Sequence, residues 1–146
     1  MPTEETVRWE RDTTPEWPQQ EEEDRELRAE IDHATDHLVK MAESRDEDES
    51  VYSKDAFARA VSFLTVHSTK AHDLCSSYPP APKIGLGPGE SIDLHWKQEK
   101  WELLVNIPAD ANRMAVFYGD DYGKANFKGS FDPKTVNLGL VAWLMH

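Results

Sequence analysis

The stretch SIDLHWKQEKWELLVNIP, from Ser91 to Pro108, decides the fold of the second half of this chain. Apolar and polar residues alternate on both sides of a charged centre, which is typical of strands with one dry face. With Gln98 and Glu99 as a two-residue loop, facing positions match in character. The expected pairs are Lys97 with Lys100, Trp96 with Trp101, Leu94 with Leu103, and Ile92 with Val105. The stretch therefore predicts an antiparallel β-hairpin whose two tryptophans form a core pair.

The alternation continues beyond the hairpin and predicts two more strands. RMAVFY, residues 113–118, and ANFKGSF, residues 125–131, are separated by a turn rich in glycine and aspartate. The side chains expected on the apolar side of the sheet are Met114, Val116, Tyr118, Phe127 and Phe131. We therefore expect a four-stranded antiparallel meander with one buried face.

This register also predicts a contact patch on the outer face of the sheet. Leu104 and Phe117 would lie exposed there among charged side chains, unless the arm or a helix covers them. The loop YGDDYGK adds Asp120, Asp121 and Tyr122 at its tip. Acids and tyrosines in such a loop suit a basic partner or a cation, and a plain polar turn is the alternative.

Two helices precede the sheet in the predicted fold. From about Gln20 to Ser44, apolar residues recur at spacings of three and four along one narrow stripe. A second helix would begin after the N-cap Ser53 and run to about Ser76, where the segment YPPAP stops it. These segments predict a helical hairpin.

The fold class that follows is α+β, with a final helix layered on one face of the sheet. Asp132 and Pro133 have the character of an N-cap and a first helical residue. The residues expected to point inward from this helix are Val136, Leu140, Trp143 and Leu144. The predicted boundaries are an acidic mobile arm at 1–18 and a single domain at 19–146, with the helical hairpin at 19–78 and the sheet plus its helix at 83–146.

The charge of the chain limits its partners. The 146 residues carry a formal net charge of −12, which should repel nucleic acids and anionic membranes and attract a basic protein. A chain this acidic could instead act as a nucleic-acid mimic. Trp9 and Trp17 in the acidic arm are candidate anchors for a partner.

Several classes of protein are disfavoured by composition. No apolar run approaches the roughly 20 residues that span a bilayer, and the N-terminus has no signal-peptide pattern, so we expect a cytoplasmic protein without a membrane partner. The only cysteine, Cys75, excludes an internal disulfide framework. We expect no cofactor and no direct nucleic-acid binding, whereas a homodimer is compatible with the narrow helical stripe and the open sheet face.

An enzyme is the alternative interpretation. His33 and His37 are four residues apart on the first helix and could hold a metal, with His67 approaching from the second. His95 beside Glu102 on the sheet could serve as an acid–base pair. Solvated helix histidines and a surface ion pair are the simpler explanations of both sets.

The block GESIDLHWKQEKWELLVNIPADANRMAVFYGDDYG resembles a group of small uncharacterised bacterial proteins. Their C-terminal half carries a GSIDLHW…ELLVNIP…YGDD pattern after a proline-rich linker, and the likeness covers roughly residues 79–131. The matching residues are Gly89, Ser91, Ile92, Asp93, Leu94, His95, Trp96, Asn106, Ile107, Pro108, Tyr118, Gly119 and Asp120, with Glu90 as an insertion. The resemblance implies a bacterial setting linked to mobile elements or defence, and it implies no catalytic residues.

These observations favour a non-enzymatic, acidic protein-binding module. It would act as a partner or inhibitor of a basic protein, as an antitoxin or an anti-defence protein does. A metal-dependent or acid–base hydrolytic enzyme and a nucleic-acid mimic stay open as alternatives.

Overall fold

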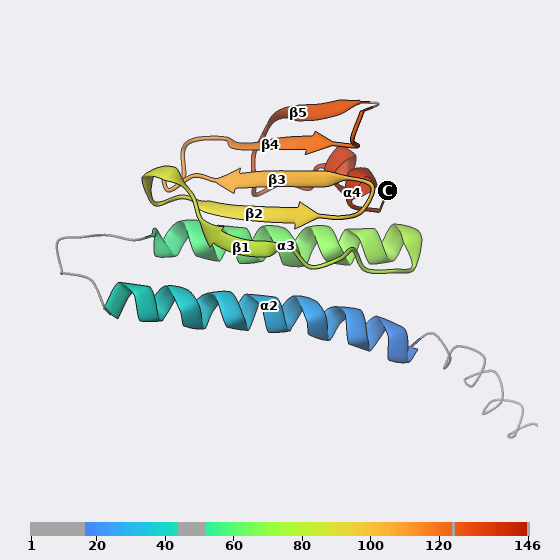
Figure 1. Ribbon diagram of the computed structural model, residues 1–146, viewed down its shortest axis with the longest axis horizontal. Helices are drawn as coiled ribbons and strands as arrows, with labels where there is room; N and C mark the ends of the chain where they lie inside the picture. The colour runs from blue at the N-terminus through green and yellow to red at the C-terminus, as the bar shows by residue number, and fades with distance from the viewer. Residues whose placement is uncertain (1–16, 44–51, 124, 146) are drawn as a thin grey trace, which may run out of the picture.

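A five-stranded antiparallel sheet forms the centre of the structure, with helices α3 and α4 on one of its faces (Figure 1). This computed structural model describes residues 17–43, 52–123 and 125–145. The strands are β1 (Lys83–Leu86), β2 (Ile92–Lys97), β3 (Glu102–Ile107), β4 (Ala115–Asp120) and β5 (Asn126–Phe131). Each strand pairs with the next one along the chain. The α+β class and the meander are confirmed, and the predicted four strands become five because the segment before Ser91 pairs with β2.

The predicted register of the first hairpin is wrong by two residues. Trp96 faces Leu103 rather than Trp101, and the backbone N–H of Gln98 donates to the carbonyl of Trp101 at 2.8 Å. The loop thus has four residues, as its lack of a favoured Asn-Gly or Asp-Gly pair permits. Because side chains alternate with a period of two, an even shift keeps every residue of β2 and β3 on its predicted face. Both tryptophans are buried, but they are not a cross-strand pair.

The predicted faces of β4 are reversed. Phe117 points into the core, and its ring centroid lies 4.6 Å from that of Phe127 and 5.9 Å from that of Phe131. Val116 and Tyr118 are exposed instead. The segment RMAVFY is apolar at both odd and even positions, so alternation alone could not choose between the faces. Contact with Phe127 and Phe131 of β5 determines the inward face of β4, because Phe117 packs against both rings.

Helix α3 (Lys54–Cys75) agrees with its predicted bounds. Ser53 caps it by accepting a hydrogen bond from the N–H of Ala56 at 3.1 Å, and Ser76 ends it in a left-handed conformation with φ of 60°. The helix lies across the inner face of the sheet and buries Ala56, Ala60, Phe63, Leu64, His67, Ser68 and Ala71. This burial joins α3 to the hydrophobic core of the sheet.

Helix α4 (Leu138–Leu144) begins later than the sequence predicts. Asn137 is its N-cap and accepts from the N–H of Leu140 at 3.1 Å. Asp132 instead closes a turn, in which its carboxylate accepts from the N–H of Lys134 at 2.9 Å. As a result Val136 is exposed, although Leu140 and Leu144 are buried as expected.

Helix α2 (Trp17–Glu43) lies along the edge strand β1 (Figure 1). Leu27 and Ala34 are buried, and Glu30 lies 3.9 Å from the ammonium group of Lys83 on β1. Helices α2 and α3 run antiparallel, as the predicted helical hairpin requires (Figure 1), and the structure differs from the prediction in that α2 also lies along β1. The helix begins at Trp17 and not at Gln20, and residues 1–16, with Trp9, lie outside the described residues.

No helix in the described part of the chain combines the length and the apolar character that crossing a membrane requires.

Candidate partner-binding surface

One face of the sheet lies opposite α3 and α4 (Figure 1), and the strand pairing places polar and apolar residues on it in cross-strand rows. We call it the open face. Its central row is Lys83, His95, Leu104, Tyr118 and Lys128. The flanking rows are Gly85, Asp93, Asn106, Val116 and Ser130 on one side, and Lys97, Glu102, Asp120 and Asn126 on the other. Because outward side chains of adjacent strands lie close together, these rows form one continuous surface.

The middle of the open face is apolar. Leu104 is 39% exposed, and its cross-strand partner Tyr118 is 47% exposed. Val116 on β4 is 50% exposed, and Met114, just before β4, is 51% exposed and lines the same cavity as Val116. We call these four residues the open-face patch. The predicted patch consisted of Leu104 and Phe117. Only Leu104 is confirmed, because the faces of β4 are reversed and Phe117 is buried.

Beside the patch, a hydrogen bond joins His95 to Glu102. The Nε2 atom of His95 lies 2.5 Å from Oε2 of Glu102, and the hydroxyl of Tyr122 donates to Oε1 of Glu102 at 3.4 Å. The hydrogen bond from His95 lowers the pKa of Glu102, against an opposing effect of desolvation. Desolvation, followed by the charge of Glu102, raises the pKa of Tyr122. Glu102 is thus a carboxylate with two neighbouring hydrogen-bond partners on an exposed surface.

A polar network on the other side of the patch fixes Asn106. Its amide nitrogen donates to Ser91 Oγ and to Asp93 Oδ1, both at 2.8 Å. Ser91 in turn donates to the carbonyl of Pro88 at 2.6 Å, so its oxygen is free to accept. A Cβ on Gly87 would come within 2.4 Å of Ser91 Oγ, which explains the glycine there. The network borders a cavity of about 440 Å³.

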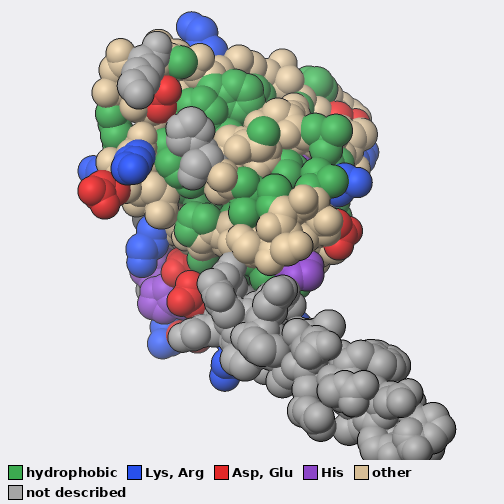
Figure 2. Space-filling view, turned by 90° about the vertical axis from the view of Figure 1, so that its right-hand side faces the viewer, with side chains coloured by type: hydrophobic (Ala, Val, Ile, Leu, Met, Phe, Trp, Pro, Cys, Tyr) green, Lys and Arg blue, Asp and Glu red, His purple; other side chains and the backbone are tan. Residues whose placement is uncertain are grey.

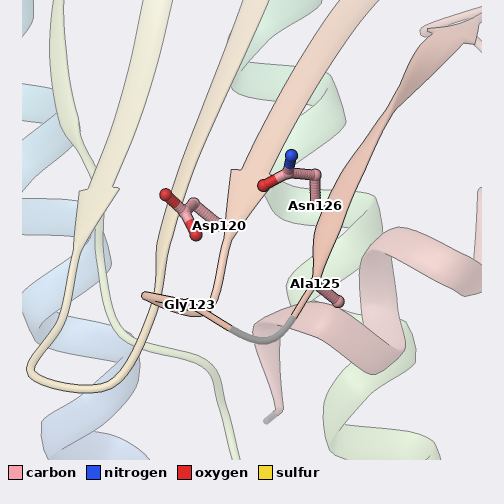
Figure 3. Close-up of a pocket in the computed structure, with 4 residues that line it drawn as sticks. All are labelled: Asp120, Gly123, Ala125 and Asn126. Atoms are coloured by element: carbon pink, nitrogen blue, oxygen red, sulfur yellow. The ribbon is translucent and has the colours of Figure 1, made fainter.

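The turn between β4 and β5 uses its acids internally. Asp120 accepts from the N–H of Tyr122 at 2.8 Å, and Asp121 accepts from the N–H of Ala125 at 2.7 Å. Tyr122 has a φ of 62°, a left-handed conformation that these bonds stabilise. A small cavity of about 360 Å³ lies at this turn, and Figure 3 shows Asp120 and Asn126 on the two strands beside it. The predicted acidic tip is therefore partly a structural turn, with Tyr122 reaching toward Glu102.

The net charge is confined to the first third of the chain. Residues 1–51 contain 18 Asp and Glu against 6 Lys and Arg, which gives −12, whereas residues 52–146 contain 10 of each and are balanced. The described part of this acidic third is α2, which lies along the β1 edge of the open face (Figure 1). The sequence of α2 contains nine Asp and Glu against three Lys and Arg, so an acidic helix lies beside the β1 edge of the sheet.

The helix histidines do not come together. His33 and His37 are exposed on α2, while His67 is 1% exposed inside the core. The Nε2 atom of His67 accepts from the N–H of Asn137 at 3.0 Å, so its Nδ1 carries the proton and donates to the carbonyl of Phe63 at 3.0 Å. With both nitrogens engaged, His67 holds α4 against α3. Within residues 17–43, 52–123 and 125–145, no three His, Cys, Asp or Glu side chains form a group suited to a metal.

Sequence reasoning missed part of this surface. Met114, Val116 and Tyr118 were expected inside, and the network around Asn106 was not recognised. The amide of Asn106 within the apolar run from Leu103 to Ile107 was the available signal, but the predicted register did not place it opposite Asp93. Cys75 is exposed at the end of α3.

No protein-family model, curated protein or solved structure matches this chain. The likeness of residues 79–131 to small bacterial proteins stays a prediction.

Proposed function

We propose that this chain is an acidic protein-binding module of the cytoplasm, and that its open face docks a basic protein. The observation that carries the proposal is the open-face patch, a group of exposed apolar side chains framed by charged residues. Such a surface resembles the centre of a protein interface, where apolar contacts supply affinity and the surrounding rim keeps water out of them.

The distribution of charge on the chain predicts that the partner carries a positive net charge. The acidic helix α2 lies along β1 at the edge of the sheet, so a basic protein would be attracted to that edge before it docked. Steering of this kind raises association rates and weakens as salt screens it. An antitoxin-like or anti-defence inhibitor is the narrower form of the proposal, and it rests on the likeness to bacterial proteins of such settings.

The experiment compares proteins recovered with a tagged chain from cells of its source. Val116→Asp places a charge in the open-face patch, and Leu74→Glu is the control at a leucine that is 60% exposed near the end of α3. Figure 2 shows that hydrophobic side chains also gather at that end of the molecule, so the control tests a rival apolar surface. Circular dichroism establishes that both variants fold.

We expect one basic protein to be recovered in stoichiometric amount with the unaltered chain and with Leu74→Glu. We expect this protein to be lost with Val116→Asp. Recovery that is equal for all three, or lost only with Leu74→Glu, would contradict docking on the open face. Competition by DNA for the recovered protein would identify a nucleic-acid mimic.

The pair of His95 and Glu102 favours acid–base catalysis as a second candidate function. Two cavities border the open face, and neither is lined by these two residues. Glu102→Gln separates the candidates, because it removes the base and leaves the patch intact. A catalytic pair predicts that this variant still binds its target but no longer converts it, whereas a binding module predicts no conversion by either protein.

A further inference from the structure

The two edges of the sheet differ in how they are covered. Helix α2 lies along β1, whereas no described element lies along the outer edge of β5. In the described residues β5 contacts the sheet through β4, and five of its six residues are exposed or half-buried. An open edge of this kind presents backbone donors and acceptors to any extended chain that approaches.

The outward groups of β5 can be assigned from its pairing with β4. The N–H of Asp121 donates to the carbonyl of Ala125, which makes these two residues a hydrogen-bonded pair. Because such pairs alternate with non-bonded ones, Phe127, Gly129 and Phe131 bond to β4. The N–H and C=O groups of Asn126, Lys128 and Ser130 therefore point away from the sheet.

We propose that this edge pairs with the same edge of a second copy, which gives an antiparallel dimer with one continuous ten-stranded sheet. The proposal is independent of the partner on the open face. A two-fold axis at Gly129 places Lys128 opposite the second copy's Ser130 and Phe127 opposite the second copy's Phe131. The diagonal neighbours of Lys128 in the second copy are then Asp132, which is attractive, and Lys128, which is repulsive but no longer directly opposite.

The competing registers fit less well. An axis at Lys128 sets the two lysines directly opposite each other, which is unfavourable. An axis at Phe127 pairs only the first half of the strand. An axis between residues would pair outward groups with inward ones and form no hydrogen bonds. Of these axes, the one at Gly129 keeps most of the strand paired, moves the lysines from directly opposite to diagonal positions, and places the half-buried Phe127 ring beside another phenylalanine.

Analytical ultracentrifugation of the full chain over a wide concentration range tests this dimer. Because of the two-fold axis, each dimer contains two facing pairs of residues 128 and 130. A charge introduced at Ser130 therefore changes two cross-strand pairs. Ser130→Glu should tighten the dimer and Ser130→Lys should weaken it, each by roughly two- to thirtyfold in Kd. Adding Lys128→Glu to Ser130→Lys should reverse most of the loss, because the facing charges become opposite again.

Ala29→Glu and Ala29→Lys are the matched controls, since they make the same charge changes at an exposed site on α2 and should leave Kd unaltered. Sedimentation as a monomer at every concentration would overturn the proposal. A dimer whose Kd ignores the charge at position 130 would overturn it as well.

Discussion

At the scale of single residues, His67 links the fold to pH. Burial lowers its pKa from the ordinary 6.5, against a smaller opposing effect of its bond to Phe63. The folded chain thus keeps His67 neutral while the unfolded chain takes up a proton. Stability from the neutral form is therefore complete above about pH 6.5 and declines as pH falls below it.

We expect the free energy of unfolding, measured with urea, to decrease between pH 7 and pH 5. His67→Gln should be less stable at pH 7, because it fits the site less well, but it should show a smaller decrease over that interval. An equal decrease in both proteins would assign the effect to other groups.

Gly119 is a second residue whose identity has a specific structural reason. A Cβ at this position would lie 2.9 Å from the ring of Trp143, which packs over the strand. Gly119→Ala must displace that ring, and we expect it to cost about 1–3 kcal/mol of stability. Gly85→Ala is the control, because its Cβ would meet no atom within 4 Å. Thermal unfolding compares the two, and equal losses would show that the indole moves aside without cost.

At the scale of elements, the sequence predicts helices and strands correctly where its apolar pattern fits only one periodicity and one face. The bounds of α3 follow from Ser53 and the prolines, and β2 and β3 follow from strict alternation. The choice of face for β4 does not, because 113–118 is apolar at both parities and only contact with the phenylalanines of β5 decides it. The start of α4 was also hidden, since Asp132 caps a turn as readily as a helix.

Helix α2 is attached to the body by a narrow face, which gives a prediction for this element. Ala34 is 3% exposed, whereas Ala29 on the same helix is exposed. Ala34→Lys should lower stability by roughly 1–3 kcal/mol and speed hydrogen exchange in α2 more than in α3. Ala29→Lys adds the same charge and should change neither. Exchange in α3 that rises as much as in α2 would mean that the two helices unfold together.

At the scale of the whole molecule, the residues that attract a basic partner differ from the residues on which it docks. The acidic third of the chain supplies the net charge, and the balanced part supplies the open-face patch. We expect salt to reduce the association rate with the partner far more than it increases the dissociation rate. Surface plasmon resonance at several salt concentrations measures both rates. A salt effect confined to dissociation would contradict this division.

The most direct test of docking on the open face is hydroxyl-radical footprinting of the partner complex. Bound partner should reduce oxidation of Met114 and Tyr118 several-fold and leave Leu74 and Leu138 at their rates in the free chain. Protection of Leu74 or Leu138, with Met114 and Tyr118 still oxidised freely, would place the partner elsewhere and contradict the account.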